Sequence, residues 1–191
     1  SHFALSFANN SRDVDQIRNI SGVDAFIISK IESLSGIQNL ESISKSSDAL
    51  LIDRGDLSRQ VPLEMIPQTQ KFIIKTTKEY ERPVYVATNL LESMVSNPSP
   101  TRAEVNDIHN TLIDGADALV LAAETAIGKH PLACVSMIKK IIENFERPYI
   151  DNNFTFPINS VSLLVEPHGG NLIQSYISDE EKKNINKLHQ I

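Results

Sequence analysis

Five short, nearly continuous apolar runs recur along the chain, at residues 3–7, 25–31, 49–52, 83–87 and 118–123. Each run has the length of a strand, and strands that are apolar on both faces are typical of a parallel sheet with both faces covered. Amphipathic stretches separate the runs, so the pattern predicts a strand followed by a helix five times over. Such an alternation predicts an α/β protein whose parallel sheet is either open and doubly wound or closed into a barrel.

Local signals mark where the intervening helices begin. Ser11 is a candidate N-cap for the first helix, and Pro62 or Pro67 suits the first turn of the third. Residues 101–104 have the Thr-x-x-Glu spacing of a capping box, and Pro131 begins the last and longest apolar stripe. These signals support an order of about five strand-helix units.

The last part of the chain differs from this repeating pattern. Residues 148–160 lose the helical period and contain several Asn and Pro residues, which predicts a linker. Residues 161–165 predict one more strand, at the start of a tail that runs to residue 191. A segment of this length cannot bury a core of its own. We therefore expect a barrel-type domain over 1–147 and a tail over 161–191 that begins a further domain or packs against the barrel.

Composition and charge narrow the class of protein. The 191 residues are 41% hydrophobic and 22% charged, which suits a folded core and excludes a disordered tail or a fibrous repeat. The net charge is −6 and no long basic run occurs, so we expect neither nucleic acid nor a membrane surface as a partner. With one cysteine, Cys134, and no apolar run of membrane-spanning length, the sequence favours a cytoplasmic protein.

Polar residues lie where the predicted strands end, and loops at such ends carry function in βα proteins. Lys30 and Glu32 are two positions apart and project to the same side of the second strand. Asp56 follows the third strand, Thr88 the fourth and Glu124 the fifth. A lysine near carboxylates from neighbouring strands suits Mg²⁺-assisted phosphate chemistry. Taken singly, a Lys-x-Glu pair is more often a solvated salt bridge, and an Arg-Gly-Asp tripeptide is usually a turn.

Five segments, in this order and spacing, resemble pyruvate kinase: Ile-Ser-Lys-Ile-Glu at 28–32, Arg-Gly-Asp-Leu at 54–57, Ala-Thr-Asn-Leu-Leu-Glu-Ser-Met at 87–94, Asn-Pro-Ser-Pro-Thr-Arg-Ala-Glu at 97–104 and Glu-Thr-Ala at 124–126. The resemblance extends from residue 3 to about residue 146. It implies a partial (β/α)₈ TIM barrel in which this chain holds the fourth to eighth strands. The first three strands, the lid domain after the third and the carboxy-terminal regulatory domain are then outside the chain.

The resemblance also implies an activity and roles for the residues at the strand ends. The reaction of the family is Mg²⁺-dependent transfer of a phosphoryl group from phosphoenolpyruvate to ADP, which yields pyruvate and ATP. Lys30 resembles the lysine that stabilises the enolate and the phosphoryl group during its transfer. Glu32 and Asp56 resemble the ligands of Mg²⁺, or of Mn²⁺, and we expect them within a few ångströms of each other. Thr88 resembles the hydroxyl that lines the enolpyruvate pocket near the protonation step.

Substrate binding is implied for Arg54, Gly55, Asp56 and Thr88. Arg54 and Gly55 resemble the loop whose backbone amides receive the substrate carboxylate. The family's K⁺ site and a substrate-binding arginine come from strands that this chain does not encode. We therefore expect the chain by itself to be inactive unless the remaining barrel strands are supplied from elsewhere.

The chain departs from the family pattern at several positions. Asp53 stands where the family has a small residue, and it is expected to set a carboxylate beside an anionic substrate. At ~4 Å two like charges repel by about 1 kcal/mol in water and by more at a lower dielectric. Residues 58–60 replace the usual Gly-Val-Glu, Asn89 replaces Gln, and Ala122 and Ala123 replace Ser-Gly. These departures favour weakened substrate binding.

The tail carries a second resemblance. Residues 164–172, Leu-Val-Glu-Pro-His-Gly-Gly-Asn-Leu, resemble the amino-terminal segment of bacterial ATP sulfurylase, also called sulfate adenylyltransferase. The alternative is an ordinary glycine turn. If the resemblance holds, the chain is part of a fusion, and a second function is possible: a non-catalytic scaffold, dimerisation or anion-sensing module attached to sulfate activation.

A sheet of five strands has two open edges, and we expect these edges to be covered. Exposed strand edges and an uncovered barrel interior favour association with other chains. We therefore expect a homo-oligomer, completion by the missing barrel strands, or capping of an edge by residues 161–165.

Overall fold

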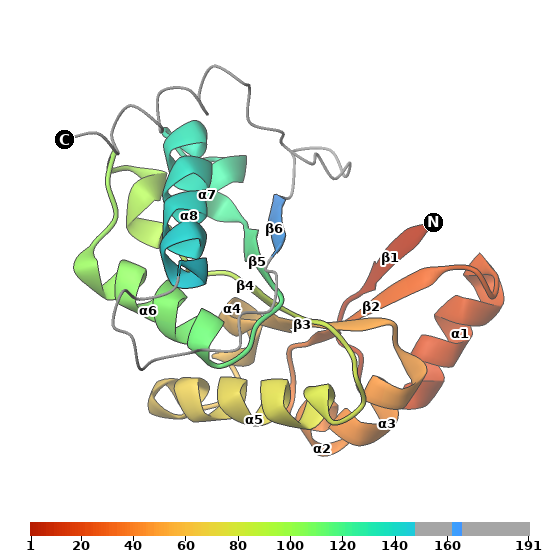
Figure 1. The fold of residues 1–191 in the computed structure, drawn as a ribbon. Coiled ribbons are helices and arrows are strands. Elements are labelled where there is room, and N and C mark those ends of the chain that lie inside the picture. The colour runs from red at the N-terminus through yellow and green to blue at the C-terminus, as the bar shows by residue number, and fades with distance from the viewer. Residues whose placement is uncertain (148–161, 166–191) are drawn as a thin grey trace.

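The computed structural model describes residues 1–147 and one strand beyond them, and it shows a single parallel sheet (Figure 1). The strands follow one another across the sheet in the order of the chain: β1 (His2–Leu5), β2 (Phe26–Ile31), β3 (Ala49–Asp53), β4 (Val84–Ala87), β5 (Ala118–Leu121) and β6 (Ser162–Val165). All neighbouring pairs are parallel. The five strands predicted from the apolar runs are thus confirmed, and so is the parallel sheet.

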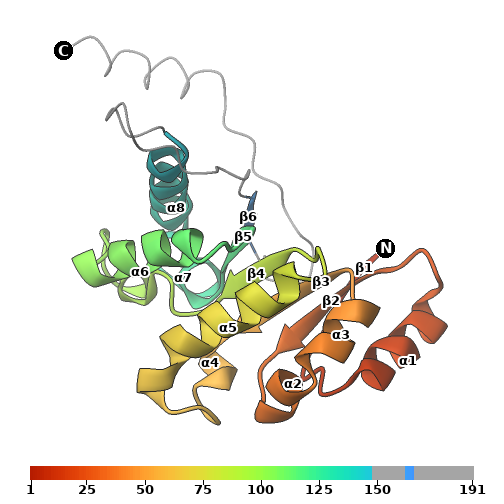
Figure 2. The ribbon, with the colours of Figure 1, turned by 60° about the horizontal axis from the view of Figure 1, so that its bottom comes forward.

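Helices connect the strands and follow the outer side of the curved sheet, from α1 through α5 to α8 (Figures 1 and 2). Their bounds are α1 Ser11–Ser21, α2 Leu34–Gln38, α3 Leu40–Ser46, α4 Arg54–Leu57, α5 Ile66–Lys78, α6 Arg102–Ile113, α7 Ala123–Ala126 and α8 Pro131–Glu146, with 3₁₀ turns η1 Leu63–Met65 and η2 Glu92–Val95. A doubly wound sheet reverses its strand order and carries helices on both faces. Neither occurs in the described residues, so the architecture is a partial (β/α) barrel.

The ends of the helices show which local signals decided their position. The cap of α1 is Asn10 and not Ser11, because Asn10 has the extended backbone of a cap and its side chain accepts a hydrogen bond from the first turn. Asp13 completes a capping box by accepting from the backbone of Asn10. The capping box at 101–104 is confirmed at the start of α6. Pro67 lies in the first turn of α5.

The core divides along the two faces of the sheet. The outer face packs against the helices through two clusters, one built on Ile27, Leu50, Ile52 and Val86 and the other on Leu119, Leu121, Ile108, Cys134 and Ile138. The inner face carries a small cluster of Leu51, Ala87 and Val120, with Ile28 and Tyr85 against it. Side chains therefore alternate along each strand between helices and barrel interior, as the period of a strand requires. Cys134 is fully buried, as expected for a small core residue.

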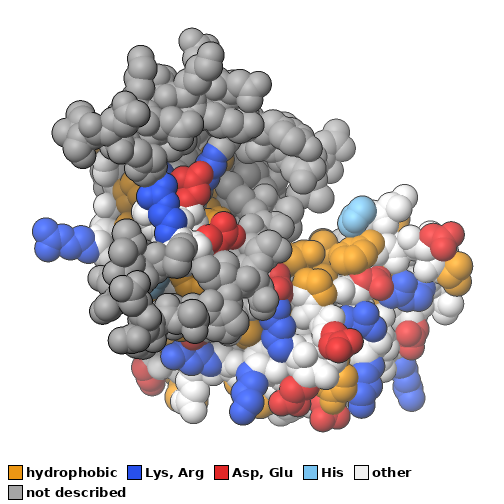
Figure 3. All heavy atoms as spheres, viewed as in Figure 1, with side chains coloured by type: hydrophobic (Ala, Val, Ile, Leu, Met, Phe, Trp, Pro, Cys, Tyr) orange, Lys and Arg blue, Asp and Glu red, His pale blue; other side chains and the backbone are white. Residues whose placement is uncertain are grey.

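The two edges of the sheet differ. Capping by the tail is confirmed at one edge, where β6 pairs with β5 in parallel from Ala118↔Ser162 to Leu121↔Val165. At the other edge β1 has β2 as its neighbour among the described strands, and apolar side chains lie exposed over β1 and β2 (Figure 3), including Phe3 at 41% exposure. The predicted linker over 148–160 and the tail after Val165 lie outside the described residues. Among the helices described, none is sufficiently long and apolar to cross a bilayer.

Candidate active site at the strand ends

Strand alternation places three charged side chains on the inner face of the sheet, at the mouth of the partial barrel. Lys30 pairs in register with Leu51, an inner-face residue, and Glu32 follows two positions later. Asp53, two positions after Leu51, ends β3 and pairs with Ala87. The polar mouth is therefore a direct continuation of the apolar inner face.

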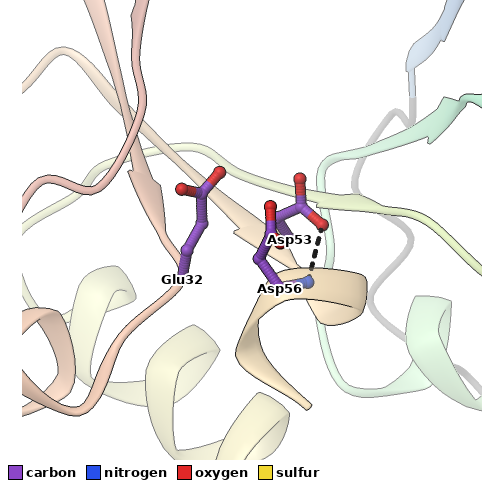
Figure 4. A group of neighbouring side chains, drawn as sticks. All are labelled: Glu32, Asp53 and Asp56. Carbon is purple, nitrogen blue, oxygen red and sulfur yellow. Dashed lines mark hydrogen bonds between the residues drawn. The ribbon is translucent and has the colours of Figure 1, made fainter. Parts of the chain in front are cut away.

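Three carboxylates meet at this mouth (Figure 4). Oxygens of Glu32, Asp53 and Asp56 all lie within 4.8 Å of one another. Glu32 follows β2, Asp53 is the last residue of β3, and Asp56 lies in the short helix α4 directly after it. Glu32 is fully buried and Asp53 is 8% exposed. The expected proximity of Glu32 and Asp56 is confirmed, and Asp53 is a third member of the same group.

The Lys30 ammonium lies between two of these carboxylates. It forms an ion pair with Glu32 and another with Asp53, whose Oδ2 is 3.1 Å from Nζ. Burial alone lowers the pKa of the ammonium, but the hydrogen bonds and charges of Glu32 and Asp53 outweigh it, so the pKa of Lys30 lies above its ordinary value. The other oxygen of Glu32, Oε2, accepts a hydrogen bond from the backbone of Phe7 at 2.9 Å. Lys30 is therefore a charged group held in place.

Asp53 makes more contacts than its sequence position suggests. Its Oδ1 is 3.1 Å from the Thr88 hydroxyl and 3.5 Å from the amide of Asp56, where it caps α4. The sequence predicts Asp53 only as a source of repulsion near a substrate, and that reading misses its pairing with Lys30. A signal for the pairing exists, because Asp53 lies two positions after Leu51 and so projects to the same face as Lys30.

Thr88 and Asn89 form a strained connection after β4. Their φ angles are +67° and +54°, and a positive φ is unusual for a β-branched residue such as threonine. Arg54 holds the connection: its guanidinium is buried and donates to the carbonyls of Thr88 and Asn89 at 2.9–3.1 Å. It also pairs with Asp107 at 2.8 Å. Arg54 therefore shapes the loop, and its charge is already matched.

Gly55 and Thr88 lie in direct contact across the mouth. The amide of Gly55 donates to Thr88 Oγ1 at 2.7 Å. A Cβ at Gly55 would be 3.4 Å from both the Thr88 hydroxyl and an oxygen of Asp53, which is an ordinary van der Waals contact. The loop amides that the family resemblance links to a substrate carboxylate thus face Thr88 and Asp53 in this structure.

Glu124 has a structural role. It is 2% exposed, and its two oxygens accept hydrogen bonds from the backbone amides of Leu91 at 3.1 Å and Ala122 at 3.0 Å. It is not one of the three carboxylates that lie together. Its place at a strand end makes it a candidate from sequence, but its hydrogen bonds are those of a residue that fixes a loop.

The three carboxylates fit a hard divalent cation. Carboxylate oxygens are preferred ligands of Mg²⁺, which binds them at about 2.1 Å, and the three side chains offer oxygens within 4.8 Å of one another. Glu32 Oε1 is buried, and its partner is the Lys30 ammonium in an ion pair. Asp56 is partly exposed and pairs with Arg59 at 3.3 Å. The donor set therefore suits Mg²⁺ or Mn²⁺, with Glu32 and Asp56 as expected ligands.

Comparison with known proteins decides the family. The family described as pyruvate kinase, barrel domain, matches residues 2–135. The chain belongs to the pyruvate kinase family. It is 49% identical over 149 residues to pyruvate kinase of Thermotoga maritima, covering 76% of this chain and 32% of that protein. It is 47% identical over 167 residues to pyruvate kinase of Thermoplasma acidophilum, covering 85% and 31%.

A third pyruvate kinase, from Methanocaldococcus jannaschii, is 40% identical over 151 residues, which cover 78% of this chain and 34% of that protein. The chain thus spans about a third of the length of the pyruvate kinases it matches. These relatives confirm the resemblance drawn from the five sequence segments. They do not bear on the ATP sulfurylase resemblance of residues 164–172, which stays a prediction. The individual roles of Lys30, Thr88, Arg54, Gly55, Glu32 and Asp56 stay predictions as well.

Proposed function

We propose that this chain supplies the metal-binding and phosphoryl-handling side of a pyruvate kinase site. The reaction is transfer of a phosphoryl group from phosphoenolpyruvate to ADP, with Mg²⁺ and, as in the family resemblance, K⁺. The observation that carries the proposal is one charged lysine beside carboxylates that lie within 4.8 Å of one another at the barrel mouth. Phosphoryl transfer depends mainly on positioning and charge stabilisation, and this group offers both.

The chain's own residues have distinct tasks in this proposal. Glu32 and Asp56 hold Mg²⁺, which when bound neutralises negative charge on the substrate. Lys30 offers a fixed ammonium where charge develops on the phosphoryl group and the enolate. Thr88 Oγ1 has a single proton and faces two acceptors, Asp53 Oδ1 at 3.1 Å and the carbonyl of Ala87 at 2.6 Å. Its hydroxyl is therefore able to reorient between acceptors, as a group beside a protonation step requires.

The isolated chain is not expected to turn over substrate. It corresponds to about a third of the length of its relatives, and the K⁺ site and a substrate-binding arginine implied by the family are not among its matched segments. Positioning accounts for a large share of catalysis in phosphoryl transfer, so the loss of these contacts removes most of the rate. The activity belongs to a protein in which the rest of the barrel is present.

A second candidate is a non-catalytic scaffold or anion-sensing module, attached to sulfate activation if the tail resemblance holds. One observation favours it: Lys30 is already paired with two carboxylates, Glu32 and Asp53. A lysine whose positive charge is balanced by two carboxylates attracts an anionic substrate less strongly than an unpaired lysine does. The two candidates differ in whether the completed barrel forms pyruvate.

A chimera tests the proposal. Residues 2–146 of this chain replace the corresponding segment of Thermotoga maritima pyruvate kinase, and pyruvate formation is followed by a coupled assay with Mg²⁺ and K⁺. We expect turnover by the chimera and none by the 191-residue chain. Lys30→Met, which keeps the side-chain volume, should lower kcat about 100-fold or more. The matched control is Lys45→Met, an exposed lysine on α3, which should leave kcat unchanged.

Two outcomes contradict the proposal. Robust pyruvate formation by the isolated chain refutes its expected inactivity. A folded chimera, with the circular dichroism and thermal unfolding of the parent enzyme, that forms no pyruvate supports the non-catalytic candidate instead.

A further inference from the structure

We propose that Asp53 is an internal anion that sets the affinity of the site for anionic substrates. Its carboxylate takes up the donors at the barrel mouth that an incoming anion needs, so a ligand has to compete with it. The proposal rests on the proposed function for the identity of the natural anion, but the competition itself is a property of this chain's contacts.

The two oxygens of Asp53 contact three donors. Oδ2 lies 3.1 Å from Lys30 Nζ, while Oδ1 lies 3.1 Å from Thr88 Oγ1 and 3.5 Å from the amide of Asp56. A protein carboxylate thus sits where a carboxylate or phosphate of a small ligand would find an ammonium, a hydroxyl and an amide together. Charge-assisted hydrogen bonds of this kind are stronger than neutral ones.

Burial strengthens the competition. Asp53 is 8% exposed, and electrostatic contacts are stronger where water is largely excluded. The backbone of Asp53 is fixed by its pairing with Ala87 in the sheet, so only rotation of the short side chain can move the carboxylate away. An anion entering the mouth therefore either displaces this carboxylate or binds close to it.

The formal charges at the barrel mouth also indicate that Asp53 opposes the binding of an anion. The Lys30 ammonium faces the carboxylates of Glu32, Asp53 and Asp56, and the exposed Arg59 pairs with Asp56 at 3.3 Å, which leaves one net negative charge. With a divalent cation bound, the group carries one net positive charge, whereas the same group without Asp53 would carry two. Arg54 adds no attraction, because its guanidinium pairs with Asp107 at 2.8 Å. Asp53 thus lowers the positive charge with which the metal-loaded mouth attracts an anion.

Binding measurements on the full 191-residue chain test the proposal directly. Phosphoenolpyruvate and inorganic phosphate are titrated calorimetrically in saturating Mg²⁺ against wild type and Asp53→Asn. Asparagine keeps the size of the side chain and an acceptor for Thr88 but removes the charge. We expect Asp53→Asn to bind phosphoenolpyruvate about tenfold more tightly, which corresponds to about 1.4 kcal/mol. Inorganic phosphate should shift in the same direction.

Control variants separate charge from other effects. Glu41→Gln removes one exposed carboxylate from α3, where it pairs with Lys45, and should leave both affinities unchanged. Asp53→Ala removes charge and volume together and should also tighten binding, which keeps the test available if Asp53→Asn folds poorly. Unchanged affinity in a folded Asp53 variant overturns the proposal. Weaker binding of both Mn²⁺ and phosphoenolpyruvate also overturns it, because Asp53 is then chiefly a metal ligand.

The chimera separates this inference from the proposed function. In an active chimera, Asp53→Asn should lower the KM for phosphoenolpyruvate. If the chimera forms no pyruvate but Asp53→Asn still tightens anion binding, the proposed function fails and the inference stands. If the chimera is active and neither KM nor affinity changes on Asp53→Asn, the inference fails and the proposed function stands.

Discussion

Two buried glutamates lie at the carboxyl ends of strands in the same sheet, and they have different partners. Glu32 follows β2 and Glu124 follows β5, and both are at most 2% exposed. Both oxygens of Glu124 accept hydrogen bonds from backbone amides, those of Leu91 and Ala122. Glu32 has one backbone donor, Phe7, on Oε2, while Oε1 faces the Lys30 ammonium.

The difference shows how the surroundings of a carboxylate decide its availability. Two fixed amides satisfy Glu124 within the protein, and no ligand is needed to complete its contacts. Glu32 keeps one oxygen directed at the Lys30 ammonium and not at a second backbone amide, and its carboxylate oxygens lie within 4.8 Å of those of Asp53 and Asp56. The strand ends of β2 and β3 are therefore suited to chemistry, and the strand end of β5 is suited to holding a loop.

The largest expected effect is on stability at Glu124. In Glu124→Ala the buried amides of Leu91 and Ala122 lose their acceptor, and each unsatisfied group costs about 1–3 kcal/mol. We expect the free energy of unfolding to fall by about 2–5 kcal/mol, measured by urea denaturation. Glu32→Ala should lower the free energy of unfolding by less, because it leaves one amide, that of Phe7, without its acceptor and keeps Lys30 paired with Asp53. Equal losses in the two variants contradict this division of roles.

The next effect is on metal binding, where substitution of Glu32 should matter more than substitution of Glu124. Glu32→Gln should weaken binding of Mn²⁺ by at least about tenfold, or about 1.4 kcal/mol, because it removes a charged ligand from the three-carboxylate group. Glu124→Gln, the matched control, should leave Mn²⁺ affinity unchanged. Electron paramagnetic resonance of free Mn²⁺ measures both. A similar loss in the two variants indicates that Mn²⁺ binds elsewhere.

A smaller effect is expected at Arg54, which links the ends of β3 and β4. Arg54→Lys keeps the charge but cannot donate simultaneously to the carbonyls of Thr88 and Asn89 and to Asp107 in the same planar geometry. We expect a loss of about 1–2 kcal/mol in the free energy of unfolding. Faster hydrogen exchange at the amides of residues 88–91 should accompany it. Unchanged exchange there shows that the positive-φ connection is held by other contacts.

The smallest effect concerns a third glutamate, which extends the comparison to the surface. Burial raises the pKa of Glu104, but hydrogen bonds from Ser93 and Thr101 outweigh it, so the pKa lies below its ordinary value. A carboxyl whose pKa is lowered by folding adds stability above its unfolded pKa, and this stability is lost as the pH falls through the folded value.

Glu104 is only half-buried, so screening by solvent keeps its contribution below about 1 kcal/mol. Wild type should therefore lose slightly more stability than Glu104→Gln between about pH 5 and about pH 3. Urea denaturation over this range measures the difference. Parallel curves for the two proteins show that the hydrogen bonds of Glu104 do not favour its charged form.

Much of the architecture follows from local sequence. The apolar runs predict β1 to β5, because strand length and continuous burial leave a pattern that is readable within a few residues. The capping box at 101–104 is predictable for the same reason, since its partners are three residues apart. The position of Lys30, Glu32 and Asp56 at strand ends, together with the order of the motifs, is sufficient to predict from sequence that these three residues share one site.

Other features were decided only by the tertiary structure. The cap of α1 is Asn10 and not Ser11 because of backbone conformation, which the two neighbouring polar residues do not reveal in sequence. Pairing of Ser162–Val165 with β5 joins segments that are far apart along the chain. Sequence offers capping, self-association and completion by other strands as alternatives, and it has no means to choose among them.

The site shows the same limit at atomic scale. Sequence places Lys30, Glu32, Asp53 and Glu124 at strand ends because side-chain direction alternates locally along a strand. Which carboxylate receives backbone amides depends on loops from elsewhere: the amide of Leu91 reaches Glu124 across 33 positions, and that of Phe7 reaches Glu32 across 25. The chain's local pattern determines which residues face the mouth, and packing of distant loops determines which of them remain free for chemistry.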